Sequence, residues 1–199
     1  MMGGGGFSFK AANAICAKLE SEERSMPDLK PLYDEDFVLW SEHQAEALRA
    51  TARGGSNQLI DWENVAEEIG DLAKSERRGL RNQIRRIIVH LVKLEHSPAT
   101  EPRPGWRESI GDARVQIEDI LDDSPSLRRS IEEVIRHQTE RGVRLAIADL
   151  EDRGELSSSL RQELKAKSYL DIFAYTPEQI LGDWFPREPT KPARRGRQP

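Results

Sequence analysis

The chain has 199 residues, of which 37% are hydrophobic and 33% charged. This composition favours amphipathic helices over sheets, because such a helix needs only about three apolar residues in seven. Its net charge of −5 gives no whole-chain case for binding nucleic acid or a membrane surface, and no apolar run approaches the roughly 20 residues of a membrane span. The single Cys16 excludes an internal disulfide and fits a reducing compartment, so we expect a soluble cytoplasmic protein.

Residues 1–31 are expected to form a flexible extension outside the domain. The glycine run at residues 3–6 is typical of a linker, and residues 11–23 could form a short helix. The stretch lacks the basic start and clear apolar core of a signal peptide. Pro27 and Pro31 then mark the entry to the domain.

A first helix is predicted over residues 33–53. Apolar or uncharged side chains recur on one side of it at helical spacing. They are Tyr33, Phe37, Trp40, Gln44, Ala47 and Leu48. The sequence GGSN at residues 54–57 ends this helix.

The longest predicted helix covers residues 61–95 and would be about 50 Å long at 1.5 Å per residue. Asp61 is a natural N-cap, and Ile60 and Val65 stand at the two positions of a hydrophobic staple. Gly79 marks a point where the helix could bend. An apolar stripe follows the whole length through Val65, Ile69, Leu72, Leu80, Ile84, Ile87, Leu91 and Leu94.

Two further helices are expected after a proline-rich loop. The third helix covers residues 106–122, with Trp106, Ile110, Ala113, Ile117 and Leu121 on one side. Ser124 as N-cap and Pro125 at the first position start a fourth helix, which continues to about residue 153 before Gly154 stops it. Its apolar side is made of Leu127, Ile131, Val134, Ile135 and Leu145. After Gly142 the apolar residues move to the opposite side of the helix, which indicates a second covered face. They are Val143, Ile147 and Leu150.

The remaining residues complete an all-α prediction. Residues 159–170 are weakly helical, and Thr176 with Gln179 forms a capping box. Residues 187–199 are basic and proline-rich, and we expect them to be disordered. No β-alternation of useful length and no internal repeat is found. We therefore predict one domain at residues 32–186, in which four main helices pack as a bundle around the long central helix.

Several segments of this domain form an ordered set of motifs. They are LYDEDFVLWSEHQAEALR, DWENVAEEIGDLAKSERRGL, VHLVKLEHSP, Trp106 with Ile110, SPSL, and YTPEQIL before WFP. Together they resemble the bacterial "domain of unknown function 29" family over about residues 32–186. The resemblance implies a small all-α domain and supplies no activity, because the family is named for the absence of one. The glycine-rich start and the longer stretch DRGELSSSLRQELKAKSY depart from the family pattern.

Three polar residues interrupt the apolar stripe of the long helix at intervals of seven residues: Glu76, Gln83 and His90. A buried carboxylate needs a cation, a proton or water, and Arg114 on the third helix is a candidate partner. These residues are interpreted either as an interior pocket with acid–base or ligand-holding capacity, or as a polar network that fixes helix register. Neither alternative is excluded by the sequence.

The outer side of the long helix is strongly charged. Its acidic face is Glu63, Glu67, Glu68 and Asp71, and its basic face is Lys74, Arg78, Arg81 and Arg85. A magnesium site of the kind found in all-α nucleoside-triphosphate pyrophosphohydrolases would need the acids to face inward, and the helical phase turns Glu67 and Asp71 away from the stripe. The alternatives are a solvated helix with internal ion pairs and an antiparallel homodimer that opposes acids to bases.

No metal or other cofactor is expected, because the four histidines (His43, His90, His96 and His137) share no zinc-ligand spacing. We expect a non-enzymatic interaction or accessory module with an unknown protein partner. An enzyme or small-ligand binder that uses Glu76, Gln83, His90 and Arg114 is one alternative. Nucleic-acid association through the basic half of the long helix and the tail arginines is the other, and the acidic balance disfavours it.

Overall fold

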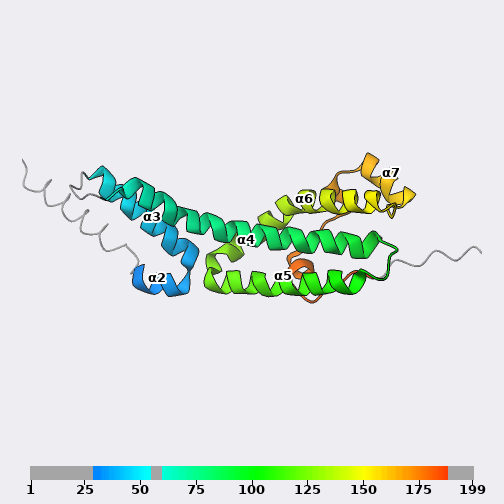
Figure 1. Cartoon of the computed structure of the whole chain (residues 1–199), viewed down its shortest axis with the longest axis horizontal. Coiled ribbons are helices and arrows are strands. Elements are labelled where there is room, and N and C mark those ends of the chain that lie inside the picture. The colour runs from blue at the N-terminus through cyan, green and yellow to red at the C-terminus, as the bar shows by residue number, and fades with distance from the viewer. Residues whose placement is uncertain (1–28, 55–59, 188–199) are drawn as a thin grey trace, which may run out of the picture.

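The computed structural model describes residues 29–54 and 60–187, and every regular element within these ranges is a helix (Figure 1). The elements are α2 (Leu29–Glu35), α3 (Phe37–Arg53), α4 (Trp62–His96), α5 (Arg103–Asp123), the 3-10 helix η1 (Pro125–Ser130), α6 (Ile131–Asp152), α7 (Ser158–Ala166), α8 (Tyr169–Ile172) and α9 (Pro177–Leu181). The all-α prediction is confirmed. The expectations for residues 1–28, 55–59 and 188–199 lie outside the described residues. Within the described part, no helix is long and apolar enough to cross a membrane.

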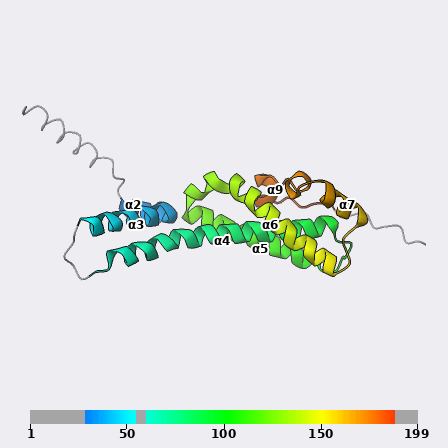
Figure 2. The ribbon, with the colours of Figure 1, turned by 90° about the horizontal axis from the view of Figure 1, so that it is seen from above.

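Helix α4 is the central helix, against which α3, α5 and α6 all pack. It begins where Asp61 accepts a hydrogen bond from the backbone nitrogen of Asn64 at 3.2 Å, as an N-cap does. It then continues without interruption to His96, which confirms the long helix predicted from the sequence. Figures 1 and 2 show α5 and α6 along the C-terminal half of α4 and α3 along its N-terminal half, while α2 packs on α3.

The C-terminal half of α4 and helices α5–α9 form what we call the body. Its core consists mainly of fully buried aliphatic residues of α4, namely Leu80, Ile84, Ile87, Ile88, Leu91, Val92 and Leu94, which pack with the inner side of α5. The five α5 residues predicted to face inward, Trp106, Ile110, Ala113, Ile117 and Leu121, are all buried. Burial of this continuous apolar side is the main source of stability for the body.

Helix α6 crosses α4 at a glycine. A Cβ atom placed on Gly142 would lie 2.8 Å from Cγ2 of Ile88, so only glycine allows this approach. The second covered face predicted for this helix is confirmed, because Val143, Ile147 and Leu150 are buried. Leu145 was expected to be buried as well, but it is 55% exposed because it lies away from the crossing.

Helix α3 packs on the N-terminal half of α4 through small side chains. Ala45 on α3 is buried, as are Ala66 and Ala73 on α4, and a Cβ atom on Gly70 would lie 3.6 Å from the Cβ of Ala45. We call α2, α3 and residues 62–76 of α4 the arm. It extends beyond the body in both views (Figures 1 and 2).

The predicted first helix is wrong at its start, because residues 33–53 form two helices and not one. Asp36 separates them with an extended backbone (φ −156°, ψ 95°). Its carboxylate accepts hydrogen bonds from the backbone nitrogen of Leu39 at 2.9 Å and from the backbone nitrogen of Ser126 at 2.6 Å. Asp36 therefore caps α3 and also ties the arm to η1.

The predicted start of the fourth helix is wrong for a related reason. Ser124 was expected to cap that helix, but its hydroxyl accepts a hydrogen bond from the backbone nitrogen of Val38 at 3.2 Å. The chain after it forms η1, and α6 begins at Ile131. Ser124 thus provides a second polar connection between body and arm.

The predicted helix end at Gly154 and the predicted capping box at Thr176 are both confirmed. Gly154 has φ +68°, the left-handed conformation that ends a helix most easily at glycine. The weakly helical stretch contains α7 and α8. The capping box between Thr176 and Gln179 starts α9, with the Thr176 hydroxyl accepting from the backbone nitrogen of Gln179.

Candidate functional site

The four residues proposed as an interior polar site do not converge. Gln83 donates a hydrogen bond from Nε2 to Oε1 of Gln116 on α5 at 2.6 Å. The Arg114 guanidinium donates to the carbonyl oxygens of Gln179, Ile180 and Trp184 at 3.0, 3.0 and 2.8 Å, so it holds the end of α9. The predicted pairing of Arg114 with Glu76 is therefore wrong.

His90 lies at a separate place on α4, beside Arg86 and Lys93. Burial, together with the nearby Lys93 and Arg86 charges, lowers the pKa of His90 to about 4, so the imidazole is neutral at pH 7. Its Nδ1 atom is buried without a hydrogen-bond partner among the described residues. Lys93 forms an ion pair with Asp149 of α6 at 2.9 Å. His90 therefore has basic neighbours, and it does not form an acid–base pair with Glu76.

The charged residues predicted for the outer side of α4 lie at its surface. The acidic face, made of Glu63, Glu67, Glu68 and Asp71, is exposed. Of the basic face, Lys74 and Arg78 are exposed, whereas Arg81 and Arg85 are half-buried. Lys74 pairs with Asp71 at 2.6 Å within the helix. In the described residues, no three His, Cys, Asp or Glu side chains come together in a way that could hold a metal ion.

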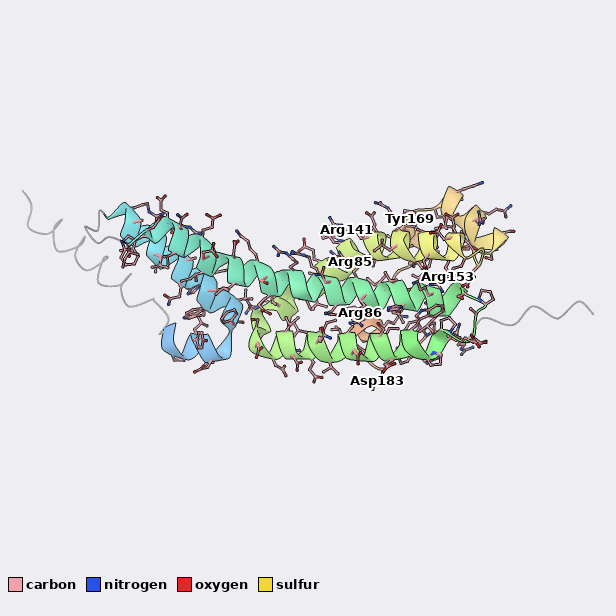
Figure 3. The ribbon with its side chains drawn as sticks, viewed as in Figure 1. Arg85, Arg86, Arg141, Arg153, Tyr169 and Asp183 are labelled. Atoms are coloured by element: carbon pink, nitrogen blue, oxygen red, sulfur yellow. The ribbon has the colours of Figure 1, made fainter. Side chains whose placement is uncertain are left out.

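Arg85 takes part in the packing of two helices. It donates hydrogen bonds to Asn82 at 2.7 Å and to Gln138 of α6 at 3.3 Å. Figure 3 shows Arg85 and Arg141 on the side where α4 and α6 meet, and Arg86 between α4 and α5. Arg86 donates to the Ser109 hydroxyl at 2.9 Å. This basic half of α4 is thus partly occupied in holding the body together.

The large residues of the arm are not buried as their periodicity predicts. Val65 and Leu72 of the predicted stripe are 38% and 43% exposed, and the neighbouring Ala66 and Ala73 are buried in their place. On α3 the buried residues are Val38, Ser41 and Ala45, while Phe37, Trp40, Gln44, Ala47 and Leu48 are only half-buried. Because small residues form the close contact between α3 and α4, the large residues of both stripes lie beside this contact and not within it.

The two stripes, whose residues are half-buried or exposed, share one side of the arm. Glu76 continues the stripe of Val65, Ile69 and Leu72 by one turn of α4, and it lines a cavity together with Tyr33 and Phe37 from the other stripe. The name arm face is used below for this surface, made of Phe37, Trp40, Gln44, Ala47, Leu48, Val65, Ile69 and Leu72.

The cavity at the inner end of the arm face has a volume of about 370 Å³. It is lined by Tyr33, Asp34, Phe37, Glu76 and Asp123, and we call it the acidic–aromatic pocket. The Trp40 ring supports the aromatic side, because it lies edge-on to Tyr33 at 4.8 Å and stacks on Phe37 at 5.7 Å between ring centroids.

The carboxylates of this pocket have no counter-charge. The side chains of Asp34, Glu76 and Asp123 make no hydrogen bond or ion pair with any described residue, and the lining contains no lysine, arginine or histidine. Carboxylates beside aromatic rings attract an organic cation through both charge and the ring quadrupole. The sequence indicated Glu76 through its place in an apolar stripe, but it gave no sign of Asp34 or Asp123.

A second polar group missed by the sequence analysis lies at the other end of α4. The Tyr175 hydroxyl donates to Oε2 of Glu95 at 3.1 Å, and the ring of Phe173 packs edge-on against His96. Burial raises the pKa of Glu95 to about 7, although the hydrogen bond from Tyr175 lowers it. These contacts attach the C-terminal segment to α4, and Phe173 and Tyr175 also line a largely apolar cavity of about 330 Å³ beside α6.

Comparisons with known proteins agree with this architecture. The chain is similar to the crystal structure of an alpha-helical protein of unknown function from Rhodospirillum rubrum, with a TM-score of 0.60, 24% identity, and coverage of 77% of this chain and 91% of that chain. This likeness shows the fold. No curated protein matches the chain. The family model described as "Domain of unknown function DUF29" matches residues 32–185. Because this match covers well over half of the sequence, the chain belongs to the DUF29 family.

Proposed function

We propose that this protein is a non-enzymatic interaction module of the bacterial cytoplasm, and that the arm face binds a helix of a partner protein. One observation carries the proposal. Six large hydrophobic residues of the described chain are exposed, and four of them, Tyr33, Ile60, Val65 and Leu72, belong to the arm or to its entry. A concentration of exposed apolar residues marks an interaction surface more often than single scattered ones do.

The periodicity of the arm helices supports the same proposal. A helix that repeats large apolar residues on one side has a surface that is stable when another element covers it. In the free chain the stripes of α3 and α4 lie side by side, and α5 and α6 pack on the other half of α4 (Figure 2). A third helix laid along both stripes would cover them, which is the usual way in which amphipathic helices bind a groove.

The alternatives have less support. Glu76, Gln83 and His90 have separate surroundings, so the enzyme alternative built on them lacks the convergent geometry that it assumed. A homodimer through the charged outer side of α4 stays a prediction, although Asp71 and Lys74 already neutralise each other within one helix. The location in the cytoplasm is supported by the single cysteine, Cys16.

The proposal is tested by site-specific photo-cross-linking in the native host. A benzophenone amino acid is placed at Leu72 on the arm face, and in a control protein at Leu145 on α6, which is similarly exposed. We expect a discrete cross-linked partner from position 72 that is absent from position 145. The substitution Val65→Asp should remove this product, because a charge on the arm face opposes apolar docking. Identical products from both positions, or none from position 72, would contradict the proposal.

A further inference from the structure

We propose that the segment bound by the arm face is a basic amphipathic helix, and that one arginine or lysine of this helix enters the acidic–aromatic pocket. The inference rests on the proposed function and adds the chemistry of the occupant. It follows from the position of the pocket, the unbalanced charge of its lining and the geometry of its rings.

The pocket is continuous with the arm face. Ile69, Leu72 and Glu76 follow one another on the same side of α4 at intervals of three and four residues. A helix that covers Val65 and Leu72 therefore extends towards Glu76 at its inner end. A residue about one turn beyond its apolar contacts would reach the pocket.

The neighbouring arginines do not neutralise the pocket. Arg77, next to Glu76 in the sequence, pairs with Glu42 of α3 at 2.6 Å. Arg128, the nearest base after Asp123, pairs with Asp122 at 2.8 Å. The pocket carboxylates therefore give the inner end of the arm face a negative potential, which steers a positively charged segment towards it.

The rings select an organic cation and not a metal ion. Tyr33 and Phe37 form part of the wall, and the carboxylates are too dispersed to be grouped as a metal site among the described residues. A guanidinium or ammonium group gains from the face of an aromatic ring and from a nearby carboxylate at the same time. The planar guanidinium also matches a carboxylate with two parallel hydrogen bonds, so arginine fits better than lysine.

A symmetric dimer that packs two arm faces together does not suit this surface. The residues that define the arm face include no lysine or arginine, and the pocket adds three carboxylates. Two such faces packed together would bury acidic groups without bases, which costs free energy. Charge complementarity therefore points to a different, basic partner.

The pocket is tested on the full chain with N-acetyl-arginine-amide and its neutral isostere N-acetyl-citrulline-amide. We expect saturable changes in the backbone NMR signals of Phe37 and Glu76 with the arginine probe and not with the citrulline probe. The double substitution Glu76→Gln and Asp123→Asn should weaken the arginine response at least tenfold. Glu108→Gln, which removes an exposed acid elsewhere on α5, should leave it unchanged. An equal response to both probes, or no response, would overturn the proposed cation pocket.

A cross-linking experiment separates this inference from the proposed function. We expect the peptide cross-linked at Leu72 to be amphipathic and to contain an arginine or lysine beyond its apolar residues, and the pocket double variant should reduce its yield at least fivefold. A cross-linked peptide without a base, or a yield that the double variant leaves unchanged, keeps the interaction module and overturns the basic occupant. Arginine binding without any partner at position 72 overturns the interaction module, and with it the assignment of a partner helix.

Discussion

Glu95 is a carboxylic acid whose surroundings favour its protonated form. It lies near the C-terminus of α4 under the C-terminal segment, where burial raises its pKa to about 7. The folded state therefore binds this proton more tightly than the unfolded state does. The resulting stabilisation is complete below the unfolded value of about 4.5 and is lost as the pH rises through about 7.

The substitution Glu95→Gln should remove this pH dependence, because the amide stays neutral and its oxygen still accepts from Tyr175. We expect the free energy of unfolding of the wild type, relative to the variant, to fall by roughly 3 kcal/mol between pH 4.5 and pH 8. Urea unfolding at several pH values measures this difference. The lowered pKa of His90 acts in the opposite direction below pH 6.5, but it is common to both proteins and cancels. A constant difference would contradict the burial of Glu95.

Asp36 combines two tasks that most N-caps do not share. It caps α3 and also accepts from the backbone nitrogen and hydroxyl of Ser126 at 2.6 and 3.1 Å. Asp36→Ala should lower the free energy of unfolding by about 2–3 kcal/mol, since it removes a cap and leaves a backbone group without a partner. Asp61→Ala removes an exposed cap whose side-chain hydrogen bonds among the described residues are all with Asn64 of its own helix, and it should cost about 1 kcal/mol in the same denaturation measurement. Equal losses in the two variants would show that the contact with Ser126 contributes nothing.

Replacing either of two glycines at helix contacts by alanine should change the stability of the protein, in opposite directions. A Cβ on Gly142 would lie 2.8 Å from Ile88, so Gly142→Ala should separate α6 from α4 and destabilise the protein by about 1–2 kcal/mol. A Cβ on Gly70 would lie at an ordinary contact distance from Ala45, and Gly70→Ala should stabilise it by up to about 1 kcal/mol through helix propensity. Thermal unfolding of both variants tests the two signs together.

The elements of the body could be predicted well because each has one clearly apolar side. The side of α5 predicted from periodicity is the side that is buried. The arm was different, because periodicity follows large residues and the α3–α4 contact uses small ones such as Ala45 and Ala66. Helix boundaries were wrong where Asp36 and Ser124 bond to distant residues, which no local pattern reveals.

The candidate site was predictable only in part for the same reason. Glu76 could be noticed because it interrupts an apolar stripe on its own helix. Asp123 joins it from the end of α5, and Asp34 joins it from α2, through the way in which these helices pack. A site assembled from four helices leaves no spacing in the sequence that would connect its members.

At the scale of the whole molecule, the arm and the body differ in how much apolar surface they bury. The arm interface consists largely of alanine, glycine and serine, whereas the body buries leucine and isoleucine along α4. Less burial means a smaller free energy of local opening. We expect backbone amides of α3 and of residues 66–73 to exchange with deuterium at least tenfold faster than those of residues 84–94. Uniform exchange along α4 would contradict this division.

The unbroken path of α4 from arm to body also sets a mechanical property. A tethered domain can rotate about its linker, but here the two parts share a helix of 35 residues and are held further by Asp36 and Ser124. A force applied to the arm is therefore transmitted along the helix axis and is not dissipated in a hinge. The arm end of α4 is thus held about 50 Å from the opposite end of the helix, and a partner bound there as proposed would be kept in a defined orientation relative to the body.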